Sequence, residues 1–143
     1  MRRIGLVGCV KEKAAVRRKA GELYTSTLYV RRRSYVMRTC SEWWILSAKH
    51  GLLHPETEIE PYDLALKDVR AAERRDWSRR VLEAIGRQIQ PGPGDVFEIH
   101  AGAEYRQYGL VVGGRLLGYE VMNPTEGLRL GKQLQFYERA GCR

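Results

Sequence analysis

Short apolar runs alternate with amphipathic segments along this chain, and this alternation limits the possible fold more than any other feature. Apolar runs predict strands at residues 3–7, 43–48, 96–100 and 119–122. Apolar residues at helical spacing predict one helix that starts near Thr25 or Ser26. The same spacing predicts three further helices, at 69–90, 103–112 and 127–139. Alternating strands and helices favour an α/β fold. We predict one domain over residues 1–143, a three-layer sandwich with a mostly parallel sheet of about four strands.

Polar residues and a glycine follow each predicted strand. In parallel α/β sheets ligands bind beyond the carboxyl ends of the strands. We therefore expect four segments to meet in one cavity: 8–11, 47–51, 100–104 and 123–127.

Positive charge is concentrated near the start of the chain. The formal net charge is +8, from 25 lysines and arginines against 17 aspartates and glutamates. A basic face favours anionic partners such as DNA, RNA or nucleotides, although a solvated arginine-rich surface has the same composition. Arg31, Arg32 and Arg33 are the candidate nucleic-acid-binding residues, with Arg32 on the inner side of its helix.

Several classes of protein are excluded by what the sequence lacks. Its three cysteines, Cys9, Cys40 and Cys142, are widely spaced, which favours a reducing compartment, and we expect the cytoplasm. No apolar stretch is long enough to span a membrane. Dinucleotide-binding, P-loop, hydrolase-elbow and zincin motifs are absent, and we predict neither a metal site nor a cofactor.

The segment 49–67 is predicted to be a rigid polar loop that follows a buried strand. Gly51 permits a positive φ, which would turn Lys49 and His50 towards a cleft. Tyr62 offers a face on which a base can stack, and Asp63 offers a carboxylate for a base edge or a ribose. The alternative is a loop cap, in which Ser47 and Asp63 bond loop amides and Tyr62 only packs.

Residues near the first strand suggest a nucleophile and an anion site. Cys9 lies beside Lys11, and a nearby cation stabilises the reactive thiolate. A lone cysteine at a strand end is also a common small core residue. Lys11 is a candidate clamp for phosphate or carboxylate, and Ser26 is a candidate anion ligand or an ordinary helix cap.

Two carboxylates are candidates for general acid–base catalysis. Glu104 follows the third strand, and Glu126 precedes the last helix. The alternative for Glu126 is a favourable interaction with the helix dipole.

Several passages resemble known families. The passage ILSAKHGLLHPETEIEPYDLAL (45–66) resembles the signature of YaaA-like proteins, in which a strand runs into Leu-Ser-Ala and a later Pro-Tyr-x-Leu. Four other passages resemble the pattern of a small uncharacterised family that is common in phages and actinobacteria. They are GCVKEK (8–13), LYTSTLYVRRRSYV (23–36), AGAEYRQYG (101–109) and NPTEGLRLGKQLQFY (123–137). That family also looks similar to a domain of archaeosine synthase, which acts on a deazaguanine base in tRNA. The resemblance implies a role with nucleic acid or modified bases.

Three hypotheses about function follow. In the first, an enzyme binds a nucleobase, nucleoside or nucleotide and acts on its glycosidic bond or an exocyclic carbon, using Cys9, Glu104 or Glu126. In the second, a non-catalytic or stress-associated protein binds DNA or RNA through the basic N-terminal face. In the third, the chain is an accessory subunit of a nucleic-acid modification complex.

Overall fold

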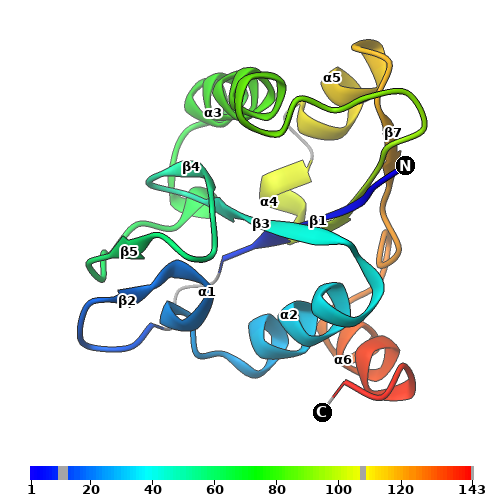
Figure 1. Ribbon diagram of the computed structural model, residues 1–143. Coiled ribbons are helices and arrows are strands. Elements are labelled where there is room, and N and C mark those ends of the chain that lie inside the picture. Colours follow the sequence, from blue (N-terminus) through cyan, green and yellow to red (C-terminus); the bar gives the residue numbers. More distant parts are fainter. Residues whose placement is uncertain (10–12, 107–108, 143) are drawn as a thin grey trace.

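A five-stranded sheet in the order β4–β3–β1–β6–β7 forms the centre of the computed structural model, which describes residues 1–9, 13–106 and 109–142 (Figure 1). Its strands are β1 (Arg3–Gly8), β3 (Glu42–Ser47), β4 (Gly51–Leu53), β6 (Val96–His100) and β7 (Glu120–Met122). β1 pairs in parallel with β3 and β6, β6 pairs in parallel with β7, and β4 is antiparallel to β3. The carboxyl ends of β1, β3, β6 and β7 therefore lie along one edge of the sheet.

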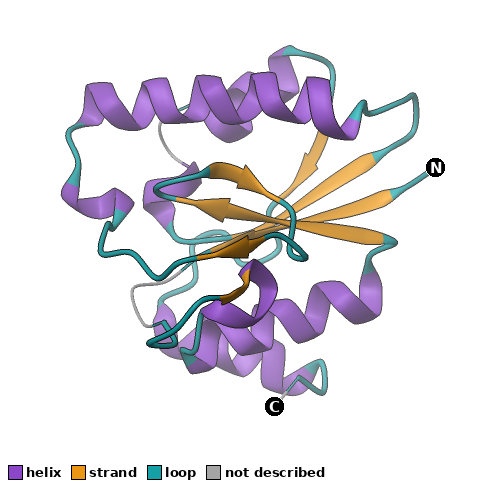
Figure 2. Ribbon diagram, turned by 60° about the vertical axis from the view of Figure 1, so that its left-hand side comes forward, coloured by secondary structure: helices purple, strands orange, loops and turns teal. Residues whose placement is uncertain are grey.

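Helices cover both faces of this sheet. They are α1 (Ala20–Leu23), α2 (Thr27–Thr39), α3 (Ala71–Ala84), α4 (Ala103–Arg106), α5 (Leu110–Leu116) and α6 (Leu130–Arg139), with a 3₁₀ turn η1 (Leu66–Asp68) and a π-helical turn η2 (Ile85–Ile89). Helices α2 and α6 pack together on one face, and α3, α4 and α5 lie on the other (Figures 1 and 2). The prediction of a three-layer α/β sandwich with a mostly parallel sheet is confirmed.

Helix α2 packs closely against the central strand β1 because the strand carries a glycine at the contact. Ser26 caps the helix by accepting a hydrogen bond from the Tyr29 backbone amide. The face towards the sheet carries Tyr29, Arg32 and Val36, which recur at helical spacing. A Cβ on Gly5 would lie 2.7 Å from Val36 Cγ1, so only glycine lets helix and strand approach this closely.

A smaller two-stranded sheet lies beside the main one. It pairs β2 (Arg18–Lys19) with β5 (Glu58–Ile59) in antiparallel orientation. The Gly21 amide at α1 donates to the Pro55 carbonyl, and the Ala20 amide donates to the Thr57 carbonyl. These bonds attach residues 18–23 to the segment that follows β4.

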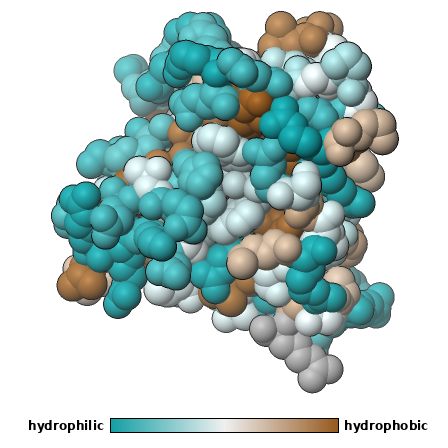
Figure 3. Space-filling model, in the orientation of Figure 1, coloured by the Kyte–Doolittle hydropathy of each residue, from teal (hydrophilic) through white to brown (hydrophobic). Residues whose placement is uncertain are grey.

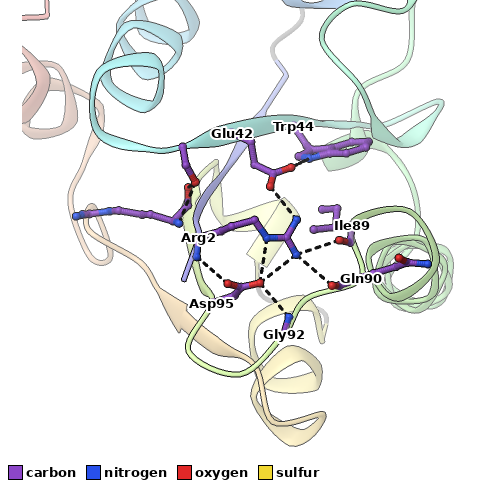
Figure 4. A network of polar contacts seen from close by, with 9 residues as sticks. Arg2, Glu42, Trp44, Ile89, Gln90, Gly92 and Asp95 are labelled. Carbon is purple, nitrogen blue, oxygen red and sulfur yellow. Dashed lines mark hydrogen bonds and ion pairs between the residues drawn. The ribbon is translucent and has the colours of Figure 1, made fainter.

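Arg2 links the amino ends of three strands (Figure 4). Its guanidinium forms ion pairs with Glu42 at 2.9 Å and with Asp95 at 3.0 Å, and it donates to the Ile89 carbonyl. The Asp95 carboxylate also accepts from the Gly92 amide, and backbone hydrogen bonds from Gly92 and from Arg2, followed by the Arg2 charge, lower the pKa of Asp95 to about 2. One charge of the N-terminal basic cluster is therefore used to hold the sheet together.

The structure corrects the prediction for residues 49–67. That segment is not a continuous loop, because β4, β5 and η1 lie within it. β4 raises the number of strands in the main sheet to five, one more than predicted. Residues 48–50 form the tight turn of a β3–β4 hairpin, and Gly51 has φ 69°, the positive value that the sequence suggested.

Two helix boundaries also differ from the predictions. Where one helix was predicted over 103–112, the structure has two, α4 and α5. The last helix begins at Leu130 rather than Gly127. Within the described residues, no helix is both long and apolar enough to cross a membrane.

Candidate functional site

A cavity of about 410 Å³ opens at the carboxyl edge of the sheet, beyond β1 and β6. β3 lies on one side of β1 and β6 on the other, and the helices that follow β1 and β6 cover opposite faces. Ligand sites of open α/β sheets occur at such switch points. Its walls come from the ends of both strands, α2, α6 and the segment 64–67, and its polar side chains include Cys9, Arg32, Glu104 and Gln133.

Two other hollows are less suited to chemistry. One, of about 480 Å³, lies beside α3, where the charged Asp76 and Arg80 are exposed and paired with each other. Another, of about 620 Å³, lies between α3 and α5 and is mostly apolar, bordered by the exposed Leu116 and Leu117. Hydrophobic surface is visible where α5 lies (Figure 3). Of these three hollows, only the β1–β6 cavity is lined by a thiol.

Tyrosine hydroxyls surround the Cys9 thiol. Cys9 directly follows β1 and is buried, and its Sγ lies 2.9 Å from the Tyr105 hydroxyl. The Tyr62 hydroxyl donates to the same sulfur over 3.6 Å. Burial is the main cause that raises the pKa of both tyrosines, so both hydroxyls keep their protons near neutral pH. The site therefore offers hydrogen-bond donors to a thiolate.

Tyr62 fixes the chain after β5 against the end of β3. Its hydroxyl lies 2.6 Å from the Tyr24 hydroxyl and 2.7 Å from Ser47 Oγ. Ser47 Oγ also accepts from the His50 amide. The Lys13 ammonium lies over the Tyr62 ring at 4.6 Å from its centroid, so a base could stack on that side only if Lys13 moved. In this structure the Ser47 and Tyr62 side chains hold the loop.

Arg32 is buried in the cavity wall, with 3% of its surface exposed. Its Nη2 donates to Gln133 Oε1 at 3.0 Å, and Gln133 in turn donates to the Leu128 carbonyl. Burial is the largest cause that lowers the pKa of Arg32, although arginine stays charged near neutral pH. The sequence correctly predicted that Arg32 lies on the inner side of its helix, but it suggested nucleic-acid binding as the role of this residue. Gln133 was not predicted as a site residue.

A chain of buried polar groups lies behind this wall, on β6. His100 Nε2 lies 2.8 Å from Glu98 Oε1, and His100 Nδ1 lies 2.7 Å from the Tyr137 hydroxyl. Burial lowers the pKa of His100, so the ring is neutral, and because a carboxylate only accepts, Nε2 carries the proton. Burial alone would raise the pKa of Glu98, but hydrogen bonds from His100 and Arg3 lower it overall. These side chains form a rigid support beneath the site.

The two candidate carboxylates lie in different places. Glu104 lines the cavity, and its carboxylate lies over Gly102, where an added Cβ would be 2.8 Å from both oxygens. Glu126 is exposed in the turn after β7 and is absent from the cavity lining. The structure therefore brings Glu104, but not Glu126, together with Cys9.

The remaining predicted ligand residues that the structure describes do not line the cavity. Lys49, His50 and Asp63 have exposed surface, and the first two lie on the β3–β4 turn beside Tyr62: the His50 ring packs edge-on at 5.6 Å between centroids, and the Lys49 ammonium lies 5.8 Å from the Tyr62 centroid. Burial and the Lys49 charge lower the pKa of His50. Ser26 caps α2, and Lys11 lies outside the described residues.

Arg31 and Arg33 are half-buried and bonded to backbone. Arg31 donates to the Leu134 carbonyl and Arg33 to the Gly21 carbonyl. No group of three or more histidine, cysteine, aspartate or glutamate side chains that could hold a metal occurs in the part of the chain that the structure describes. All three cysteines are free.

Comparison with known proteins places the chain in a family. A family model matches residues 4–139, which extend from β1 to the end of α6. The chain belongs to a family of unknown function, DUF6884. No curated protein and no solved structure matches it. The family description names no activity, so the resemblance to YaaA-like proteins stays a prediction.

Proposed function

We propose that the chain is an enzyme that binds a nucleobase, nucleoside or nucleotide at the carboxyl edge of its sheet. The enzyme acts on the glycosidic bond or on an exocyclic carbon of the base. The observation that carries this proposal is the β1–β6 cavity, where Cys9, Arg32 and Glu104 border a space of about 410 Å³. That volume falls in the range of about 300–1,000 Å³ that small-molecule sites occupy.

The lining supplies a role for each part of such a reaction. Glu104 is the proton donor or acceptor, because its carboxylate makes no hydrogen bond or ion pair with the rest of the described chain. Cys9 is the nucleophile, and the hydroxyls of Tyr62 and Tyr105 stabilise its thiolate. The apolar segment 64–66 provides a surface for a planar base.

Nucleic-acid binding through the N-terminal basic face is the second candidate, supported by the net charge of +8. Many of those charges are already engaged in the fold. Arg2 and Arg3 form ion pairs with strand carboxylates, and Arg17 and Lys19 form ion pairs with Glu60 and Glu56. Arg32 is buried and cannot reach a phosphate on the outer surface. Pairing and burial therefore weaken the second candidate.

A thermal-shift panel of nucleobases, nucleosides and nucleotides tests the proposal. A ligand at about 100 times its Kd stabilises the folded state by about 2.7 kcal/mol, which raises the melting temperature of a chain of this size by about 5 °C or more. Glu104→Gln should abolish turnover of the ligand found, measured by chromatography of products, whereas Glu126→Gln should not. Equal loss in both variants, or a panel without any binder, would reject the enzyme hypothesis.

A further inference from the structure

Unpartnered buried polar atoms gather around one part of the fold. Within the described residues, five buried side-chain atoms lack a hydrogen-bond partner: Arg31 Nε, Arg32 Nε, Arg106 Nε, Asn123 Oδ1 and Thr125 Oγ1. They come from α2, α4 and the turn between β7 and α6, three segments near the carboxyl edge of the sheet. Buried polar groups in folded proteins are nearly always hydrogen-bonded, so such a concentration indicates a missing partner.

Arg32 is the member of this group that borders the cavity. The Nη2 of Arg32 donates a hydrogen bond to Gln133, but the Nε–H of Arg32 has no hydrogen-bond acceptor within the described residues. Within the described chain no carboxylate lies within ion-pair distance of Arg32, so no direct partner neutralises its charge. Apart from burial, interactions with Tyr137 and with the Glu104 carboxylate favour the charged form of Arg32, whereas the positive charge of Arg106 disfavours it. A buried guanidinium in this state is a strong binding site for an oxyanion.

We propose that Arg32 is the oxyanion anchor of the cavity and that the ligand is a nucleoside monophosphate. This inference rests on the proposed function, because the nucleoside part is taken from it. The phosphate accepts the Nε–H of Arg32, while Gln133 holds the guanidinium in place from the other side. The base and ribose then extend towards Cys9 and Glu104, which line the same cavity.

Titration calorimetry with three probes tests the anchor: inorganic phosphate, a nucleoside, and the corresponding nucleoside 5′-monophosphate. The variants are Arg32→Met, which keeps the volume and removes the charge, and Arg32→Lys, which keeps the charge and removes the Nε–H. Arg87→Met is the matched control, because Arg87 is exposed on η2, which precedes β6 at the amino edge of the sheet. Circular dichroism first verifies that each variant is folded.

The wild type should bind the monophosphate about 10- to 100-fold more tightly than the nucleoside. Arg32→Met should lose this difference, Arg32→Lys should keep only part of it, and Arg87→Met should keep all of it. Equal binding of nucleoside and monophosphate, or a difference that survives in Arg32→Met, overturns the anchor while leaving the proposed function intact. If Arg32→Met does not fold, Arg32→Lys decides. A smaller difference between nucleoside and monophosphate than in the wild type supports the anchor, and an unchanged difference overturns it.

If no nucleoside or nucleotide binds, the proposed function fails, and inorganic phosphate and acetate then test the anchor alone. Phosphate binding that is lost in the Arg32 variants supports an oxyanion site for another substrate. If acetate binds more tightly than phosphate, the assignment of a phosphate is overturned, and the group that Arg32 binds is a carboxylate. Absence of binding to both probes overturns the anchor.

Discussion

Removing the hydroxyl of Tyr62 should loosen the segment that borders the cavity. That hydroxyl forms two short hydrogen bonds, with Tyr24 at 2.6 Å and with Ser47 at 2.7 Å, and a long one to the Cys9 sulfur. A typical intramolecular hydrogen bond contributes about 1 kcal/mol net, so Tyr62→Phe should lower the free energy of unfolding by about 2 kcal/mol. For a chain of this size the melting temperature should fall by about 4–8 °C.

Urea denaturation followed by tryptophan fluorescence measures this change, because Trp77 is buried in the core. Tyr119→Phe is the matched control: it removes the same atom, and in the described part of the chain the Tyr119 hydroxyl makes no hydrogen bond. The control should change the free energy of unfolding by less than about 0.5 kcal/mol. If the two variants are equally stable, the hydroxyl network does not hold the loop and the reasoning is wrong.

Three further predictions concern stability. Gly5→Ala should destabilise the fold by about 1–3 kcal/mol, because its Cβ would lie 2.7 Å from a side-chain atom of α2, whereas Gly131→Ala, in open space on α6, should stabilise it by about 0.5–1 kcal/mol; urea denaturation compares them. Burial lowers the pKa of His100 below its ordinary 6.5, so below pH 6.5 the unfolded chain binds more protons than the folded one, and stability should fall as the pH drops. If His100→Asn shows the same dependence of unfolding free energy on pH as the wild type, this prediction is wrong. Two backbone amides and Arg2 lower the pKa of Asp95 from 3.8 to about 2, so stability should also fall between those values, and acid titration of Asp95→Asn should lack this component.

The arrangement of the main sheet was largely predictable from the sequence. Buried strands read as apolar runs, and β1, β3, β6 and β7 all lie within about two residues of the predicted positions. β4 escaped prediction because it is only three residues long and lies among prolines and acids. A parallel sheet also implies that the strand ends lie along one edge, and the cavity lies at that edge. Of the four segments predicted to meet there, however, only 8–11 and 100–104 contribute residues to its lining, whereas 47–51 and 123–127 do not.

The lining of the cavity was harder to predict, because contacts between helices are not visible in local patterns. Arg32 read as part of a basic run, although its spacing from Tyr29 and Val36 already placed it on the buried face. Lys49 and His50 follow a strand as expected, but in the hairpin turn they lie beside the Tyr62 ring and do not line the cavity. Gln133 approaches Arg32 from a helix 101 positions away in the sequence, which no short-range signal reveals.

A crystal structure of the protein with the nucleotide that binds most tightly in solution tests the central claim most directly. The account predicts electron density beyond β1 and β6, with the phosphate on Arg32 and the base between Glu104 and the segment 64–66. Density in the hollow between α3 and α5, or on the outer surface, at a concentration that saturates binding in solution would contradict it.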